Sequence, residues 1–502
     1  MKRIIILALV FLPALIFSQE TWVRTYSDGP WHDWANSIIQ TSDGDYILAG
    51  GTLPLFSDSS GFYVLRIDSS GETIWTEVLN NGNYSEVNSV IQTFDGGFML
   101  AGMVNYNFGV TKIDSDGAII WAEVFERDSY AWDIASSVVQ TPDSGYAIFG
   151  KRGNIDPLSG NTDDFCLIKI DSTGDLLWMK TYGDSLTDFG TSMAKTYDNG
   201  FIMAGWTNSF SDNTDIYVIR ADSSGDTLWT RTYGTPGNDQ ANCIIQTSDS
   251  GFVIAGYTDY YGTSQNTYIV KINGSGDVIW TKYFDIDDYE TPSSIIQTSD
   301  NGFALLINTS DASHLLKLDN SGDSLWIREL LLGDFVKTNS IIQISDGGFV
   351  IAGEIAYELP DSTDVLVIKT DEYGYVSWIA DATRVPNNIH IFAYPNPFNS
   401  SVVITVSGGR GLASQTPTNI AIYDIMGNVV YAPSSVPSSS GHLLPEGEGQ
   451  MPPSPTGRGT EGEGIKSTFI WTPDKTIASG IYLVRATTQD GQTITKRIVY
   501  LK

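Results

Sequence analysis

The sequence predicts an all-β protein, in which a seven-bladed β-propeller is followed by a small antiparallel β-sandwich. A tryptophan recurs at intervals of 46 to 57 residues, the shortest from Trp75 to Trp121 and the longest from Trp121 to Trp178. Each interval contains the same short β-rich runs bounded by turns, and beyond Ala382 this repeat stops and a different pattern of strands begins. A period near fifty residues with four strands per repeat is typical of propeller blades.

One repeat shows how four strands follow from the sequence. Residues 243–247, 252–256, 267–272 and 277–283 are short runs rich in β-branched and aromatic residues. Tight turns separate the first run from the second and the third from the fourth, and a longer polar loop joins the second to the third. Runs bounded by Gly, Asp and Ser are typical of antiparallel strands, and no long segment has helical periodicity.

The number of repeats predicts how the ring closes. Residues 19–383 hold seven complete units and one surplus fourth strand, Trp22–Tyr26, and residues 384–388 are expected to be a linker. A ring closes best when its first and last strands share a blade, because no sheet edge is then exposed. We therefore expect Trp22–Tyr26 to be the outer strand of the last blade, in competition with the strand around Trp378. The recurring tryptophans are Trp22, Trp75, Trp121, Trp178, Trp229, Trp280, Trp326 and Trp378.

The aspartate and glycine before each tryptophan are expected to build a turn. In the segment from Asp222 to Gly225, glycine supplies a positive φ and the aspartate accepts backbone N–H bonds. The tryptophan is expected to pack between neighbouring blades. The alternative is a calcium loop, although none of these segments completes the alternating oxygen ligands of an EF-hand. The aspartates are Asp68, Asp114, Asp171, Asp222 and Asp319.

The blades resemble those of known propellers. The segment from Asp222 through Gly225 to Trp229 resembles the tryptophan-docking motif of quinoprotein blades, and Gly50-Gly51 resembles kelch repeats. The sialidase Asp-box is similar but has a shorter spacing. The resemblance concerns blade construction, and it implies no cofactor because no catalytic constellation accompanies it.

The N-terminus and the composition indicate a secreted protein. Residues 1–18 are expected to be a signal peptide, with Lys2 and Arg3 before an apolar stretch too short to span a bilayer comfortably. No later stretch reaches spanning length, so no transmembrane segment is expected. The net charge of −31 and the pI near 4.2 disfavour binding to nucleic acid or anionic membranes. Cys166 and Cys243 occupy ordinary strand positions, which predicts free thiols.

The C-terminal region carries a second set of motifs. In order, they are Y-P-N-P-F (394–398), I-Y-D-x-x-G (422–427), S-G-I-Y (479–482) and K-R-I-V (496–499). Residues 389–502 thereby resemble the C-terminal sorting domain of type IX (Por) secretion substrates. The resemblance implies a small β-sandwich that the type IX translocon reads, a Gram-negative source of the Bacteroidetes type, and export through the periplasm to the cell surface or the medium.

Two insertions depart from that family pattern. Residues 408–418 and 432–464 are rich in Gly, Pro, Ser and Glu. Such segments bury too little apolar surface to order themselves, so both are expected to be disordered loops.

The two faces of the propeller are expected to differ. The tight turns lie on one face, and the fourth-to-first connections and second-to-third loops lie on the other, which we call the variable face. Exposed aromatic side chains on loops of a rigid scaffold often bind sugars or partners, and the alternative is that they pack into the gaps between blades. The candidates for a glycan or protein ligand are Trp31, Trp34, Tyr84, Tyr130, Trp132, Phe189, Trp206, Tyr260, Tyr261 and Tyr289.

An acidic residue precedes the first strand in six units, and Val336 breaks the series. Seven-bladed geometry would place these carboxylates around the channel mouth, where a cation such as Ca²⁺ would offset their repulsion. The alternative is that each one caps backbone N–H groups where the chain enters its blade. The six residues are Asp33, Glu86, Asp133, Asp188, Asp239 and Glu290.

Two classes of function remain open. The first is a non-enzymatic binding protein, either surface-exposed or released. The second is a secreted polysaccharide hydrolase or lyase, which needs a paired acid and base or an arginine clamp on the variable face. Only Arg127 and Arg152 lie near such loops, and they are isolated in the sequence. We therefore favour the binding protein.

Overall fold

The computed structural model consists of β-strands and connecting loops. It describes residues 21–376 except 28–30, 55–59, 80–83, 127–131, 157–159, 211, 261–264, 288, 311, 331–334 and 357–361, together with residues 390–394, 402–407, 417–424, 429–431, 466–473, 477–478, 480–488 and 493–500. Contacts divide the chain into two compact units, Met1–Ile379 and Ala380–Lys502, and each is described by itself. The expected signal peptide and the linker at 384–388 lie outside the described residues.

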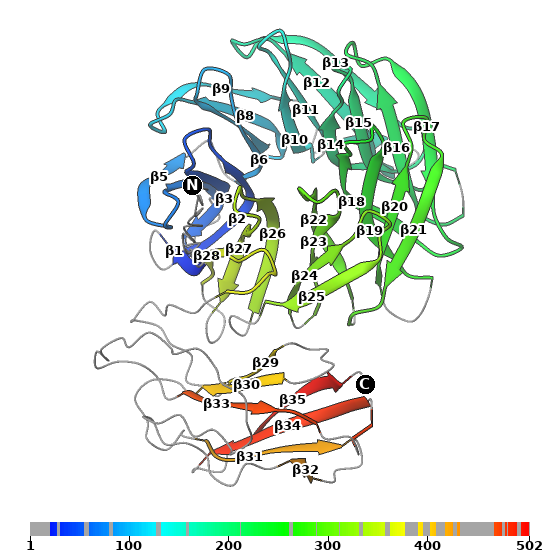
Figure 1. Cartoon of the computed structure of the whole chain (residues 1–502). Helices are drawn as coiled ribbons and strands as arrows, with labels where there is room; N and C mark the ends of the chain where they lie inside the picture. Colours follow the sequence, from blue (N-terminus) through cyan, green and yellow to red (C-terminus); the bar gives the residue numbers. More distant parts are fainter. Residues whose placement is uncertain are drawn as a thin grey trace, which may run out of the picture. The chain divides into compact units, whose positions relative to one another are not determined.

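The first unit contains seven four-stranded antiparallel sheets arranged as blades around a centre, so the predicted seven-bladed propeller is confirmed (Figure 1). The first strand of each blade lies innermost and the fourth lies outermost. Blades 1 to 3 are β2 (Trp31–Gln40), β3 (Tyr46–Pro54), β4 (Gly61–Ile67), β5 (Thr73–Leu79); β6 (Ser85–Gln92), β7 (Phe98–Val104), β8 (Asn107–Ile113), β9 (Ile119–Phe125); and β10 (Ile134–Gln140), β11 (Tyr146–Asp156), β12 (Gly160–Ile170), β13 (Leu176–Tyr182). Blades 4 to 6 are β14 (Asp188–Lys195), β15 (Phe201–Thr207), β16 (Asp215–Ala221), β17 (Thr227–Tyr233); β18 (Asp239–Gln246), β19 (Phe252–Thr258), β20 (Asn266–Ile272), β21 (Val278–Phe284); and β22 (Thr291–Gln297), β23 (Phe303–Asn308), β24 (Ser313–Leu318), β25 (Ser324–Glu329).

The seventh blade is completed by the beginning of the chain. Strands β26 (Phe335–Gln343), β27 (Phe349–Ala356) and β28 (Asp364–Lys369) are joined by β1 (Trp22–Tyr26), which pairs antiparallel with β28. Trp22 lies opposite Lys369, as Trp229 lies opposite Arg220 in blade 4. The predicted closure by Trp22–Tyr26 is therefore confirmed, and the competing Trp378 lies outside the described residues.

The tryptophans join each blade to the next. The ring of Trp229 covers Gly276 of the following blade, and a Cβ added to that glycine would lie 3.3 Å from the ring. Gly276 has a φ of 85°, a conformation that glycine adopts without strain. Trp22 covers Gly71 in the same way, so the contact continues across the ring closure. This arrangement confirms that the tryptophans pack between neighbouring blades.

The core lies between the blades. A phenylalanine that follows the first tight turn is almost completely buried in five blades, and each one contributes about 1.5–3 kcal/mol through burial. Blades 1 and 3 use tyrosine there, at Tyr46 and Tyr146. The five phenylalanines include Phe349 in the closing blade, whose valine and alanine neighbours pack against Leu48 of blade 1. The phenylalanines are Phe98, Phe201, Phe252, Phe303 and Phe349.

The innermost strands share one irregularity. The register shifts at the same position in all seven, as between Ala35 and Ser37 in β2. Such a β-bulge bends the strand and changes the face to which the next side chains point. The bulged residues are Asn36, Asn88, Ser136, Thr191, Asn242, Ser293 and Asn339.

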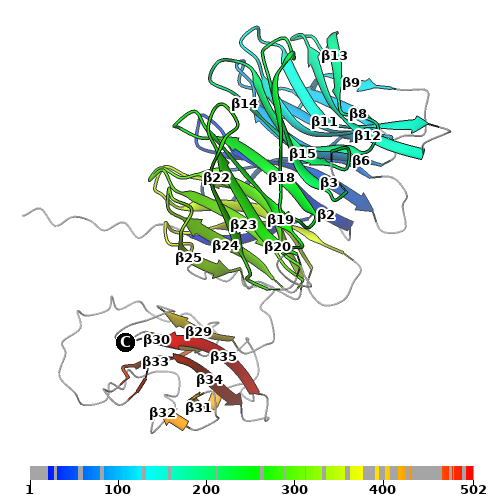
Figure 2. The same cartoon turned by 90° about the vertical axis from the view of Figure 1, so that its right-hand side faces the viewer.

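The second unit has two antiparallel sheets, which confirms the predicted β-sandwich (Figure 2). Buried Trp471 contacts Tyr482 of the other sheet, with ring centroids 5.3 Å apart. The strand that begins at Pro417 includes the last two residues of the expected insertion 408–418, while 408–416 and 432–464 lie outside the described residues. The sheets are β29 (His390–Tyr394), β30 (Val402–Ser407), β33 (Lys466–Trp471) and β32 (Val429–Tyr431), β31 (Pro417–Asp424), β34 (Gly480–Thr488), β35 (Thr493–Tyr500).

Candidate functional site

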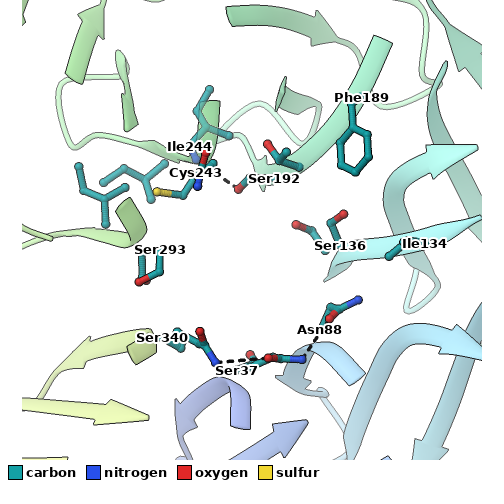
Figure 3. A pocket seen from close by; sticks show the side chains of 18 of the residues that line it. Ser37, Asn88, Ile134, Ser136, Phe189, Ser192, Cys243, Ile244, Ser293 and Ser340 are labelled. Carbon is teal, nitrogen blue, oxygen red and sulfur yellow. Dashed lines mark hydrogen bonds between the residues drawn. The ribbon is translucent and has the colours of Figure 1, made fainter. Parts of the chain in front are cut away.

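The innermost strands surround a central cavity of about 540 Å³ whose lining is mainly polar and uncharged (Figure 3). The bulged residues line it, and five of them donate hydrogen bonds to the neighbouring blade. Asn36 donates from Nδ2 to the carbonyl of Val87 at 2.9 Å, and Asn88 donates to Ala135 at 3.0 Å. Asn339 donates to Ala35 at 2.9 Å, across the closure of the ring. These side chains are therefore engaged in holding the ring together.

Five of the six acidic candidates are buried within or between the blades. Asp239 is typical, since its Oδ2 accepts a hydrogen bond from the backbone N–H of Thr235 at 2.6 Å. Burial raises the pKa of this carboxyl, and the bonds from Thr235 oppose that shift. Four of these carboxylates thus cap backbone N–H groups, which is the alternative to a cation ring that the sequence also indicated. Asp133, Asp188 and Glu290 accept backbone N–H bonds from Gly153, Asp184 and Thr267, and Asp33 is fully buried.

Glu86 is the exception, because it lies one residue later in the strand. Counting back seven residues from the last residue of a first strand reaches Asp33 from Gln40, but reaches Ser85 from Gln92. Glu86 therefore occupies the position of Trp34 and lines the central cavity. Burial raises its pKa, and Lys337 opposes this shift.

The turn aspartates cap their own turns, as the preferred interpretation predicted. Asp222 Oδ1 accepts the backbone N–H groups of Ser224 at 2.8 Å and Asp226 at 2.9 Å. Asn273 does the same in blade 5 without a charge. Within the described part of the chain, no group of three or more His, Cys, Asp or Glu residues is placed to hold a metal ion.

Three aromatic rings from three separate loops form a stack on the variable face. Tyr84 lies before β6, Tyr106 in the turn between β7 and β8, and Trp132 before β10. The centroids of Tyr84 and Tyr106 are 5.0 Å apart, and those of Tyr106 and Trp132 are 4.8 Å apart, both at 28°. Trp132 is 54% exposed and Tyr84 is 44% exposed. We call these three residues the aromatic stack; sequence reasoning identified two of them and missed Tyr106.

The backbone of the aromatic stack is unusual. Tyr84 and Tyr106 have φ values of 54° and 65°, in the left-handed region that few non-glycine residues adopt. Asn105, with φ 49°, and Tyr106 form a two-residue turn in which both residues have positive φ, a type that prefers Asn-Gly. The carbonyl of Tyr106 accepts the N–H of Asp133 at 2.8 Å, which fixes Trp132 beside it.

A second pair of candidates meets in blade 4. Phe189 and Trp206 are cross-strand partners whose rings stack at 5.2 Å and 6°. Lys151 Nζ lies 4.8 Å from the Phe189 centroid and also pairs with Asp163 at 3.2 Å. Both aromatic rings are half-buried, so this group is more enclosed than the aromatic stack.

The other aromatic candidates do not converge. Trp34 lies flat on Gly51, which leaves no room for a side chain there. Tyr260 and Tyr289 are exposed at 48% and 59% on separate loops. The side chain of Trp31 and all of Tyr130 and Tyr261 lie outside the described residues.

A pocket of about 280 Å³ lies beside the aromatic stack, between blades 1 and 2. Tyr84 belongs to both, because it stacks on Tyr106 and also lines the pocket. Aromatic, aliphatic, thioether and hydroxyl groups form the rest of the wall, with one carboxylate. The lining residues are Trp34, Leu53, Ser60, Tyr84, Ser85, Glu86 and Met103.

The two cysteines and Arg152 form no further candidate site. Neither Cys166 nor Cys243 forms a disulfide, as predicted, and burial raises the pKa of each thiol to about 12. Such thiols are unreactive at neutral pH. Arg152 lies 3.9 Å from buried Asp133, while Arg127 lies outside the described residues. Among the described residues no helix is long and apolar enough to cross a membrane.

The comparison with known families identifies the C-terminal unit. Residues 392–442 match the family described as the secretion system C-terminal sorting domain. The chain therefore carries a type IX sorting domain, as the motifs predicted, and it is exported to the cell surface or the extracellular space. This domain also implies an interaction with the type IX secretion machinery.

Solved structures similar to the chain include PorZ of Porphyromonas gingivalis, described as an essential surface component of the type IX secretion system (10% identity, 91% of this chain, 68% of that chain, TM-score 0.38). Sqt1 from Chaetomium thermophilum is also similar (12% identity, 70% of this chain, 98% of that chain, TM-score 0.43). So is a puromycin hydrolase (13% identity, 77% of this chain, 61% of that chain, TM-score 0.48). The regulatory protein FlaEY of Caulobacter vibrioides is 29% identical over 135 residues. That stretch is 24% of this chain and only 14% of the relative.

Proposed function

We propose that the protein is a non-enzymatic binding protein of the cell surface or extracellular space, and that the aromatic stack on its variable face binds a glycan. The single observation that supports this most is the combination of exposure and backbone strain in Tyr84, Tyr106 and Trp132. Strained residues cluster at functional sites, where the surrounding structure holds them in place.

The fold gives no reason for aromatic residues at these positions. On the tight-turn face, residues with positive φ are small or glycine, as at Ser250 and Gly44. A tyrosine with positive φ costs about 1–2 kcal/mol, and about half of the Trp132 ring surface remains in water. Rigid aromatic side chains supply a large contact area at low entropy cost, which suits a surface that stacks on sugar rings.

The composition of the adjoining pocket favours binding over catalysis. Glycoside hydrolysis uses two carboxyl groups about 5–10 Å apart. Of the described residues that line that pocket, Glu86 is the single carboxylate. Asp33 and Asp133, the nearest acidic candidates of the neighbouring blades, are buried away from it.

A glycan array probed with the full chain tests the proposal. We expect a limited set of related glycans to bind. Replacing a central aromatic anchor costs about 2 kcal/mol, or roughly 30-fold in affinity, so Trp132→Ala and Tyr84→Ala should each remove most of the signal. Tyr283→Ala is a matched control, because this tyrosine is 52% exposed on the outer strand β21. Equal binding by all four proteins would refute the proposal.

We further propose that residues 389–502 are required for export past the outer membrane and are not required for folding of the propeller. The two compact units and the sorting-domain match support this. A chain that lacks residues 389–502 should fold and remain in the periplasm. Surface display of that truncated chain, measured by protease accessibility on intact cells, would refute the assignment.

A further inference from the structure

The pocket between blades 1 and 2 has a wall chemistry that the glycan proposal does not use. Trp34 and Tyr84 supply aromatic surfaces, and Met103 supplies a polarisable thioether. Among the described residues that line this volume of about 280 Å³, Glu86 is the one charged group. The pocket therefore combines aromatic rings with a single negative charge.

The carboxylate of Glu86 has no counter-ion close by. Among the described residues it forms no hydrogen bond and no ion pair within 4 Å. Lys337, the cation that acts on it, also lies 3.9 Å from Glu354, and its side chain is 53% exposed. A partly buried carboxylate without compensation is costly, and a bound cation would remove that cost.

The chemistry of the wall selects among cations. A hard metal ion such as Ca²⁺ needs six to eight oxygen ligands, and the side chains of the described lining residues offer one carboxylate and two serines. The Ser60 hydroxyl already accepts the N–H of Ser85 at 2.7 Å. A primary ammonium has three N–H donors that prefer oxygen acceptors, and the aromatic and aliphatic side chains of the wall offer none. A quaternary ammonium needs no acceptor and is attracted by ring faces and by one carboxylate.

We propose that this pocket binds a quaternary ammonium group, with Glu86 as the counter-charge and the Trp34 and Tyr84 rings as walls. The inference rests on the proposed function in one respect, since Tyr84 belongs to both surfaces. A glycan on the aromatic stack and a quaternary ammonium group in the pocket would then bind side by side on the variable face. The net charge of −31 favours accumulation of such cations near the protein.

Calorimetric titration of the full chain with choline tests the proposal. The matched probe is 3,3-dimethyl-1-butanol, which has the same shape without the charge. Choline should bind at least about tenfold more tightly than this alcohol, a difference of about 1.4 kcal/mol, which is within the range of desolvated cation–π contacts. Equal affinities, or no heat of binding with choline at millimolar concentrations, would overturn the proposal.

Variants identify the groups responsible. Glu86→Gln should abolish the preference for choline over the alcohol, and Trp34→Ala should weaken choline binding at least about tenfold. Glu123→Gln removes the same charge from an exposed position on β9 and should leave the titration unchanged. If Glu86→Gln and Glu123→Gln behave alike, Glu86 is not the counter-charge. Ethanolamine binding as tightly as choline would overturn the quaternary assignment.

The pH dependence gives an independent test. Because burial raises the pKa of Glu86, choline affinity should begin to fall at a higher pH than an ordinary glutamate would give. This titration uses no glycan, so its failure is distinct from an array without binding. A pH-independent affinity would contradict a role for the carboxylate.

Discussion

The tight-turn face and the variable face are built from the same seven repeats, yet they use their residues differently. On the tight-turn face, each contact recurs from blade to blade. Buried Lys271 pairs with Asp249 at 2.8 Å, and buried Lys317 pairs with Asp300 at 2.9 Å, in equivalent positions. On the variable face, the aromatic stack occurs once. A contact that recurs in every blade is explained by the fold, while a strained contact that occurs once requires another explanation.

The residues with positive φ make the same distinction. The first tight turns place Gly, Ser or Asn there, residues that tolerate this backbone. The variable face has Asn105 and Gly183 with positive φ, and in addition three tyrosines, Tyr84, Tyr106 and Tyr289. We infer that the tight-turn face is constrained by stability and the variable face by binding. Each prediction below tests one side of this comparison.

The largest expected effect is on the contacts between blades. The Trp280 ring covers Gly322 of the next blade and contacts buried Phe303, with ring centroids 6.1 Å apart. Trp280→Ala should lower the free energy of unfolding by about 3 kcal/mol. Its neighbour Ile279 is 53% exposed, so Ile279→Ala should change stability by less than about 0.5 kcal/mol. Urea unfolding of both variants checks this, and similar losses would contradict the scaffold role of Trp280.

A smaller effect is expected at the turn caps. Asp222→Ala leaves the N–H groups of Ser224 and Asp226 without their acceptor and should cost about 1 kcal/mol. Asp222→Asn should cost much less, because Asn273 fills this role in blade 5. Denaturant unfolding with and without calcium separates the alternatives. A calcium-dependent gain that both variants lose would favour a metal loop.

The paired aspartates of the tight-turn face predict sensitivity to acid. Partial burial raises the pKa of Asp249, but hydrogen bonds from Lys271 and Thr247 outweigh it and lower the pKa to about 2. The unfolded value is about 3.9, so this contribution is present above pH 4 and is lost as the pH falls towards 2. Since the Asp249 carboxylate is half exposed, its ion pair with Lys271 contributes no more than about 1 kcal/mol to the free energy of unfolding. Asp249→Asn should flatten stability between pH 5 and 2, and an unchanged slope would contradict the ion pair.

The strain on the variable face predicts an inverted order of stability. At ordinary positions glycine is less stable than alanine by about 0.5–1 kcal/mol. At Tyr106, with φ 65°, Tyr106→Gly should be more stable than Tyr106→Ala by about 1 kcal/mol. Thermal unfolding of the two variants measures the difference. If the alanine variant is the more stable one, the left-handed turn is not present in solution.

The repeated features could be predicted because their interactions are local. Asp222 caps a turn two to four residues away, and Gly225 supplies its positive φ, so the sequence of one turn predicts its structure. The turn caps and their glycines recur along the repeats, so comparing the repeats distinguished them from chance. Ring closure was predicted from the surplus copy of the fourth strand at Trp22–Tyr26.

The candidate site was harder to predict because its contacts join two kinds of loop: Tyr84 and Trp132 hold equivalent positions before the first strands, whereas Tyr106 lies in a second-to-third connection. Tyr106 lies in a two-residue turn, and nothing in the repeat marks it as a neighbour of Tyr84 and Trp132. Glu86 was assigned to the wrong register, although counting back from Gln92 would have corrected it. For Asp239 the sequence indicated both a place in a cation ring and a backbone cap, and the repeat pattern alone did not decide between them.

The most direct test of the comparison is the free energy of unfolding of the triple variant Tyr84→Gly, Tyr106→Gly, Trp132→Ala. Stacking in the parent is worth about 0.5–1.5 kcal/mol per pair, and relief of two strained backbone positions offsets much of that loss. We predict a value within about 1 kcal/mol of the parent, because the fold does not depend on these rings. A loss of more than about 3 kcal/mol, comparable to Trp280→Ala, would show that the aromatic stack belongs to the scaffold and would contradict the account.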